Sequence, residues 1–160
     1  DAIKPFQFSD NINVIKLRVS REFSVNKFFF DNEIQYQKAS NANGILNVPE
    51  LITRNSIYFG SHLLDKALFL QTGFSISYFS KYHMNSYDPL LSEFYVQNSK
   101  KIGGFPLMDF FVNAKIQQTR LYFKLEHFNS SFTGYNFYSA PNYPYRDFSF
   151  RFGLVWNFFL

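Results

Sequence analysis

Residues 148–160 read FSFRFGLVWNFFL, with a large apolar side chain at every second position. The apolar parity holds Phe148, Phe150, Phe152, Leu154, Trp156, Phe158 and Leu160, and the other parity includes Ser149, Arg151, Gly153 and Asn157. Successive side chains of a β-strand point to opposite sides, so the alternation predicts a strand with one apolar and one polar face. The polar interruptions exclude a transmembrane helix, which needs about 20 consecutive apolar residues.

The same period of two recurs upstream and predicts an all-β protein. We expect six further strands near residues 15–25, 28–37, 54–64, 68–82, 110–117 and 121–126. Residues 94–97 suggest a short additional strand, and Ile3 to Phe8 a possible eighth long one that Pro5 weakens. Aromatic residues make up 22% of the 160-residue chain, with 23 Phe and 11 Tyr, which excludes a disordered protein.

Connections between these strands alternate between short and long. Short links lie near Val25, Asp65 and Gln118, and long ones near Asn43, Ile102 and Tyr138. Such asymmetry is typical of transmembrane β-barrels, whose strands need about 9 to 11 alternating residues. A soluble β-sandwich also alternates, but long unbroken rows of Phe and Leu rarely face solvent. We therefore predict an antiparallel transmembrane outer-membrane β-barrel of about seven or eight strands, with residues 1–160 a single barrel domain or the C-terminal segment of one.

Composition excludes several classes of function. The chain has no cysteine, hence no disulfide, no thiolate metal site and no cysteine nucleophile. The net charge of +4 comes from 16 Lys and Arg that are spread thinly, and basic and aromatic residues fall on opposite faces, which argues against nucleic-acid binding. Asp1 to Pro5 lack the features of a signal peptide, which suggests a mature chain or an internal start.

Several parts of the chain resemble known outer-membrane proteins. Phe152, Leu154, Trp156, Phe158 and Leu160 resemble the C-terminal signature of bacterial outer-membrane barrels. Residues 70–73, 94–97, 103–106, 109–115, 120–127, 141–144 and 150–159 resemble the putative porin family of Bacteroidota in order and spacing. Members of that family are much longer, so the resemblance implies the C-terminal part of a larger barrel, in contact with lipid and inserted by the barrel-assembly machinery of the bacterial outer membrane.

The polar parity supplies the candidate functional residues. We expect the lumen to be lined by Lys16, Arg18, Glu22, Asp31, Glu33, Arg54, Lys81, Asp109, Lys115, Lys124, Glu126 and Arg151. In an open pore these mixed charges set ion selectivity, and in a narrow barrel they form a salt-bridged plug. Sequence alone leaves both arrangements open.

Aromatic and histidine side chains allow weaker predictions. Tyr36, Tyr78, Tyr82, Tyr122 and Trp156 suit aromatic girdles at the membrane interfaces or ordinary cross-strand packing. The loop residues Tyr135, Phe137, Tyr138, Tyr143 and Tyr145 suit stacking on a sugar or a partner protein, or packing of the loop on itself. His62, His83 and His127 show no metal-ligand spacing, and no cofactor is expected.

The function predicted from these observations is passive diffusion of small hydrophilic solutes. One alternative is a non-conducting barrel subunit that joins other outer-membrane proteins in an assembly or secretion complex. Another is the barrel of an energy-coupled transporter, which requires a plug domain. Catalysis by His127 with Ser130 or Ser131 is conceivable at the outer end of a strand, but no nucleophile motif supports it, so we predict a protein that is not an enzyme.

Overall fold

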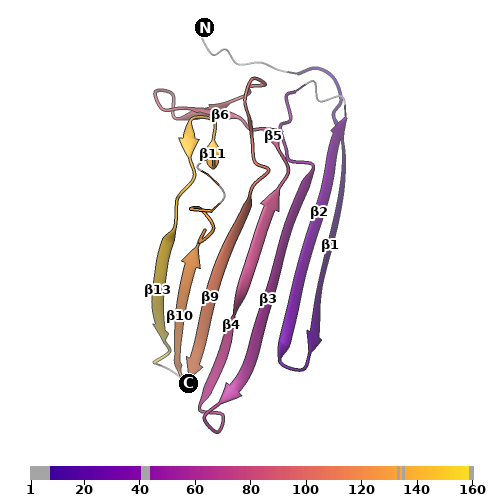
Figure 1. The fold of residues 1–160 in the computed structure, drawn as a ribbon. Coiled ribbons are helices and arrows are strands. Elements are labelled where there is room, and N and C mark those ends of the chain that lie inside the picture. The colour runs from indigo at the N-terminus through magenta and orange to yellow at the C-terminus, as the bar shows by residue number, and fades with distance from the viewer. Residues whose placement is uncertain (1–7, 41–43, 133, 135, 159–160) are drawn as a thin grey trace.

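Seven long β-strands form one sheet in the computed structural model, which describes residues 8–40, 44–132, 134 and 136–158 (Figure 1). They are β1 (Asn13–Val25), β2 (Phe28–Ser40), β3 (Leu51–Leu63), β4 (Leu68–Phe79), β9 (Pro106–Ile116), β10 (Thr119–Glu126) and β13 (Ser149–Trp156). No helix in the described part of the chain is long and apolar enough to cross a membrane.

The sheet order follows the chain, β1-β2-β3-β4-β9-β10-β13, and every neighbouring pair is antiparallel. This is the up-and-down order that the alternation of short and long links predicts. The observed strand bounds differ from the predicted ones by a few residues. The third strand begins at Leu51 rather than near Arg54, and the fourth ends at Phe79 rather than at Tyr82.

Short turns join the strands at one end of the sheet. Asn26 and Lys27 link β1 to β2, and Gln117 and Gln118 link β9 to β10. Asn26 has a φ of 57° and Gln117 a φ of 52°, as tight hairpins demand because their twist must match that of the strands. The link from β3 to β4 spans residues 64–67, of which the first three have positive φ. The short links near Val25, Asp65 and Gln118 are thus confirmed.

The long connections gather at the opposite end of the sheet (Figure 1). They contain β5 (Tyr82–His83), β6 (Ser86–Asp88), β7 (Glu93–Tyr95), β8 (Lys101–Ile102), β11 (Tyr138–Ala140) and β12 (Tyr143–Pro144). These pair as β5 with β8, β6 with β7 and β11 with β12. The short strand expected at residues 94–97 corresponds to β7, which pairs with β6 and not with the large sheet.

This loop region contains the buried apolar residues of the part of the chain that the structure describes. Among the described residues, the buried hydrophobic side chains are Ile102, Phe105, Phe137 and Ala140. The Phe105 ring lies 5.1 Å from that of Phe137 and 5.6 Å from that of Phe79 at the end of β4. The two longest connections therefore pack on one another as an ordered cap, which we call the loop cap (residues 80–105 and 127–148).

The described strands form one open antiparallel sheet, so the predicted outer-membrane barrel is not closed within the described residues. Each inner strand has two neighbours, whereas β1 pairs only with β2 and β13 only with β10. An antiparallel up-and-down barrel closes when its first and last strands pair, and these two are the edges. The possible strand at Ile3 to Phe8 falls on residues 1–7, outside the described part, and on Phe8, which is not in a strand.

Candidate functional site

The register of the sheet collects the polar parity of all seven strands on one face. Glu33 pairs with Arg54 between β2 and β3, and Ser56 pairs with Ser75 between β3 and β4. Ser75 in turn lies opposite Asp109 on β9. Because a slip of one residue would move every side chain to the other face, this register confirms that the strands share a single polar face.

The opposite face is mostly apolar, and many of its large side chains are exposed among the described residues. Ile57 on β3 is 52% exposed and Phe152 on β13 is 76% exposed, whereas Ser75 on the polar face is only 7% exposed. A soluble sheet buries its apolar side and solvates its polar side. This sheet instead leaves large apolar side chains exposed, and its polar face is also largely open, with Arg18 59% and Arg151 46% exposed.

Most of the predicted lining residues lie on the polar face. They are Lys16, Arg18 and Glu22 on β1, Asp31 and Glu33 on β2, Arg54 on β3, Asp109 and Lys115 on β9, Lys124 and Glu126 on β10, and Arg151 on β13. Lys81 follows the end of β4 and belongs to the loop cap, so the alternation of the strand does not assign it to either face of the sheet. A Cβ on Gly104 would meet its side chain.

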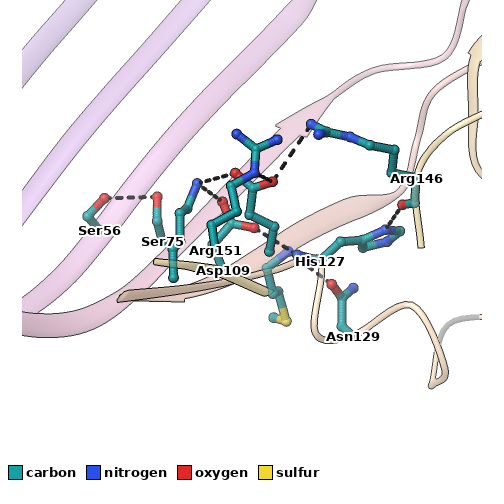
Figure 2. A network of polar contacts seen from close by, with 10 residues as sticks. Ser56, Ser75, Asp109, His127, Asn129, Arg146 and Arg151 are labelled. Carbon is teal, nitrogen blue, oxygen red and sulfur yellow. Dashed lines mark hydrogen bonds and ion pairs between the residues drawn. The ribbon is translucent and has the colours of Figure 1, made fainter. Parts of the chain in front are cut away.

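A network of charges joins β9, β10 and β13 at the end near the loop cap (Figure 2). The Lys124 ammonium lies 2.9 Å from Asp109 and 3.2 Å from Glu126. Glu126 also accepts the guanidinium groups of Arg151, at 2.9 Å, and Arg146, at 3.7 Å. Lys124 thus bridges the two carboxylates, and Glu126 contacts three cations. The network holds its side chains together, and its three cations and two carboxylates leave one positive charge in excess.

A second set of polar contacts crosses β1, β2 and β3. Arg18 forms an ion pair with Glu33 at 2.8 Å, and the Tyr58 hydroxyl donates to Glu22 at 2.6 Å. The Arg18 side chain is 59% exposed, so this pair contributes little to stability. The Tyr58 contact reaches over β2 to β1 and holds the tyrosine ring in place across the face.

His127 anchors the loop cap to the sheet. It follows β10 in a left-handed conformation with a φ of 52°, and it is 2% exposed. Its backbone N–H donates to Asp109 at 2.9 Å, and Nδ1 lies 2.8 Å from the carbonyl oxygen of Arg146. The ring packs at 4.4 Å against Phe137. His127 thereby ties the second part of the loop cap to the charge network, and a recess of about 130 Å³ lies beside it.

The structure does not support catalysis at His127. Nδ1 contacts a backbone carbonyl, and Nε2 is buried without a hydrogen-bond partner among the described residues. The Ser130 side chain is buried as well, although an active serine must meet its substrate. Among the described residues, no group of three or more His, Asp or Glu has the arrangement of a metal site.

The structure places some, but not all, of the predicted girdle residues on the apolar face. Tyr36, Tyr78 and Trp156 lie near strand ends on the apolar face. Tyr122 lies on the polar face opposite Gly153, so its assignment to a girdle is wrong. Tyr82 belongs to β5 in the loop cap, where burial raises the pKa of its phenol.

The other aromatic predictions have mixed outcomes. In the loop cap Phe137 is buried, which favours packing of the loop on itself, while Tyr138 and Tyr143 remain partly exposed. In the C-terminal signature Phe152, Leu154 and Trp156 lie on the apolar face of β13. Phe158 is exposed beyond the strand. Tyr135 and Leu160 lie outside the described residues.

Two arginines that sequence reasoning missed belong to the same face or network. Arg120 lies opposite Lys115 on the polar face, and the strict parity of β10 would have identified it. Arg146 comes from the loop cap and reaches Glu126. Its position depends on the fold of a segment without periodicity, so no sequence signal indicates it.

Comparison with known proteins gives one match. A family model described as putative porin matches residues 1–160. No curated protein and no solved structure shows a significant match to the chain. The match extends well upstream of residues 70–73, the first segment in which the sequence shows the resemblance.

Proposed function

Because the chain belongs to the putative porin family, we propose that it forms part of an outer-membrane β-barrel through which small hydrophilic solutes diffuse passively. In this proposal the apolar face of the sheet contacts lipid, and the polar face lines a water-filled pore of the bacterial outer membrane. The expected source in Bacteroidota and insertion by the barrel-assembly machinery belong to the same proposal.

The observation that carries the proposal is the exposure of the apolar face of the sheet. Large apolar side chains remain exposed along the strands, as Ile57 and Phe152 illustrate, while the buried apolar residues of the described chain lie in the loop cap. Each fully buried aliphatic or aromatic side chain stabilises a soluble fold by about 1.5 to 3 kcal/mol, and this sheet forgoes that gain on both faces. Lipid supplies the missing apolar environment.

The open edges support a barrel with more than these seven strands. The edge strands β1 and β13 leave one row of backbone groups each without a neighbouring strand. In lipid each unsatisfied backbone group costs several kcal/mol, so spanning sheets must close. Further strands therefore pair with both edges in the membrane.

The charges on the polar face favour weak anion selectivity. Lys115 and Arg120 lie opposite one another near the short turns, and the network around Glu126 has one excess cation. A pore whose wall carries more positive charge attracts anions and repels cations. We propose no catalytic role, since the one buried histidine serves as a packing and hydrogen-bonding anchor.

A non-conducting subunit of an outer-membrane assembly is the second candidate, and one observation favours it. On the apolar face Arg21 pairs with Asn32, which pairs with Asn55. These three polar residues form a continuous row across β1, β2 and β3. An arginine near the bilayer midplane on a lipid-facing surface costs about 2 to 4 kcal/mol. A partner protein that covers Arg21, Asn32 and Asn55 would remove that cost.

Single-channel recording of the purified full-length protein in a planar bilayer distinguishes the two candidates. A porin gives stable ohmic steps without partners, and a salt gradient then gives a reversal potential of the anion-selective sign. A folded, heat-modifiable barrel that stays electrically silent would refute passive diffusion and favour the assembly subunit.

A further inference from the structure

An aromatic cluster interrupts the polar face near its centre. The rings of Phe29 and Tyr58 stack with their centroids 5.0 Å apart and their planes 9° apart. The Phe111 ring follows on β9, with its centroid 6.2 Å from that of Tyr58. The three residues lie in one row of the register, in which Gly73 of β4 occupies the place between Tyr58 and Phe111.

Glycine makes this cluster possible. A Cβ on Gly73 would lie 2.2 Å from the carbonyl oxygen of Ile57 and 2.5 Å from Tyr58 Cα, far inside van der Waals contact. The bare backbone lets β3 and β4 approach closely and leaves the space above Gly73 to the neighbouring rings. At Gly153 the effect repeats, because the Tyr122 ring lies where a Cβ would be, with Cε1 at 2.3 Å.

The rings of Tyr58, Phe111 and Tyr122 line a recess in the polar face. Its volume is about 300 Å³, and its walls include Tyr58, Phe111, Tyr122, Asp31, Arg54 and Asn113. Binding sites for small molecules occupy about 300 to 1,000 Å³ and combine apolar walls with a few polar groups. The Tyr58 hydroxyl is already bonded to Glu22, so the ring is held in place before any solute arrives.

The chemistry of the recess selects a class of solute. An ion needs no aromatic wall, and an apolar molecule does not match the guanidinium, carboxylate and amide groups around the rings. A pyranose sugar matches both, because one face of its ring presents C–H groups while its rim carries hydroxyls that donate and accept hydrogen bonds. Arg54 donates, Asp31 accepts and Asn113 does both.

We propose that this recess is a binding site for neutral oligosaccharides inside the pore, with Tyr58, Phe111 and Tyr122 as the stacking surface. The inference rests on the proposed function in that the polar face must be the pore wall for passage to follow binding. The affinity of such a site for sugar must be low, since a solute has to enter the site readily and also leave it.

The test uses the purified full-length protein and three neutral probes: maltohexaose, xylohexaose and laminarihexaose. Isothermal titration calorimetry in detergent measures binding without any need for conduction, and planar-bilayer recording measures interruption of the current by sugar. We expect at least one probe to bind in the millimolar range and to interrupt the current. An aromatic contact accounts for roughly a two- to tenfold change in affinity, so Phe111→Leu and Tyr122→Leu should each weaken binding by that factor.

Phe110→Leu is the matched control, since Phe110 neighbours Phe111 in β9 but lies on the apolar face. It should leave sugar affinity unchanged. Failure of all three probes to bind in a channel that conducts would overturn the inference and leave the proposed pore intact. Equal weakening by Phe110→Leu and Phe111→Leu would also overturn it. Binding that depends on Phe111 in a silent barrel would support the recess and refute the pore.

Discussion

Arginine at Ile57 distinguishes a lipid-facing sheet from a soluble one. Ile57 lies near the middle of β3 on the apolar face, is 52% exposed, and has Phe30 and Phe74 as its register neighbours. If this face contacts lipid, Ile57→Arg places a cation near the bilayer midplane and destabilises the protein by about 2 to 4 kcal/mol. If the face is in water, replacing a half-exposed side chain changes stability by only about 0.5 kcal/mol in either direction.

The matched control is Ser20→Arg on β1. Ser20 lies near the middle of a strand of the same length, but on the polar face and opposite Glu33. There the new cation meets water and a carboxylate, and we expect no loss of stability. Ile57→Ala gives the contribution of side-chain packing alone and is subtracted from the effect of arginine.

Urea unfolding of the full-length protein in phospholipid vesicles gives the three free energies of unfolding, and heat-modifiable gel mobility confirms that each variant starts folded. The account predicts that Ile57→Arg lowers the folding equilibrium constant by roughly 30- to 1,000-fold relative to Ser20→Arg. Equal stability of the two arginine variants would show that the apolar face does not contact lipid, and the reasoning would then be refuted.

Five further substitutions test the site and the fold. Lys124→Met removes the cation shared by Asp109 and Glu126. The reversal potential in a KCl gradient should therefore shift toward cation selectivity, and the free energy of unfolding should fall by about 1 to 3 kcal/mol. An unchanged reversal potential in an open channel would place the network outside the pore. Lys115→Glu on the exposed polar face should shift selectivity in the same direction without altering the urea midpoint, and a loss of folding would contradict its placement. His127→Ala removes a buried ring contact and a hydrogen bond. The free energy of unfolding should fall by about 2 kcal/mol, and the loop cap should become susceptible to limited proteolysis. A wild-type digestion pattern would contradict the role of His127 as an anchor. Gly73→Ala forces β3 and β4 apart and should lower the yield of refolded protein, whereas Gly153→Ala, which meets the Tyr122 ring rather than backbone, should be milder.

Strand positions and faces were predictable because they depend on local alternation. Ile57 and Ser56 differ by one position and lie on opposite faces, as parity requires. Short turns near Val25 and Gln118 then determine the order of the strands, since a two-residue link forces antiparallel neighbours. These features need no knowledge of distant contacts.

The packing of the loop cap and the contribution of Arg146 to the charge network could not be predicted from alternation. Phe105 and Phe137 belong to different connections and meet only after both have folded. Arg146 reaches Glu126 because His127 holds the intervening segment against the sheet. Contacts of this kind depend on long-range packing in segments where periodicity is weak.

The partners of the edge strands and the aromatic recess could not be predicted from the sequence, for different reasons. Alternation gives each strand its faces but does not specify the partner of an edge strand, so it could not show that β1 and β13 lie apart. The recess has no signal in the alternation itself, because Gly73 and Gly153 simply continue the polar parity of their strands. Glycine in a strand interior often marks a close approach of another group, and here it marks the positions of Tyr58 and Tyr122.

Modification of single cysteines in a conducting channel tests the central claim most directly. The 160-residue chain contains no cysteine. Asn113→Cys on the polar face and Val112→Cys on the apolar face therefore each add a single thiol to it. The account predicts that a negatively charged, membrane-impermeant thiol reagent reduces the single-channel conductance of the Asn113→Cys variant and leaves that of the Val112→Cys variant unchanged. A reduction at Val112→Cys alone, or no effect at either position, would contradict the assignment of the polar face to the pore.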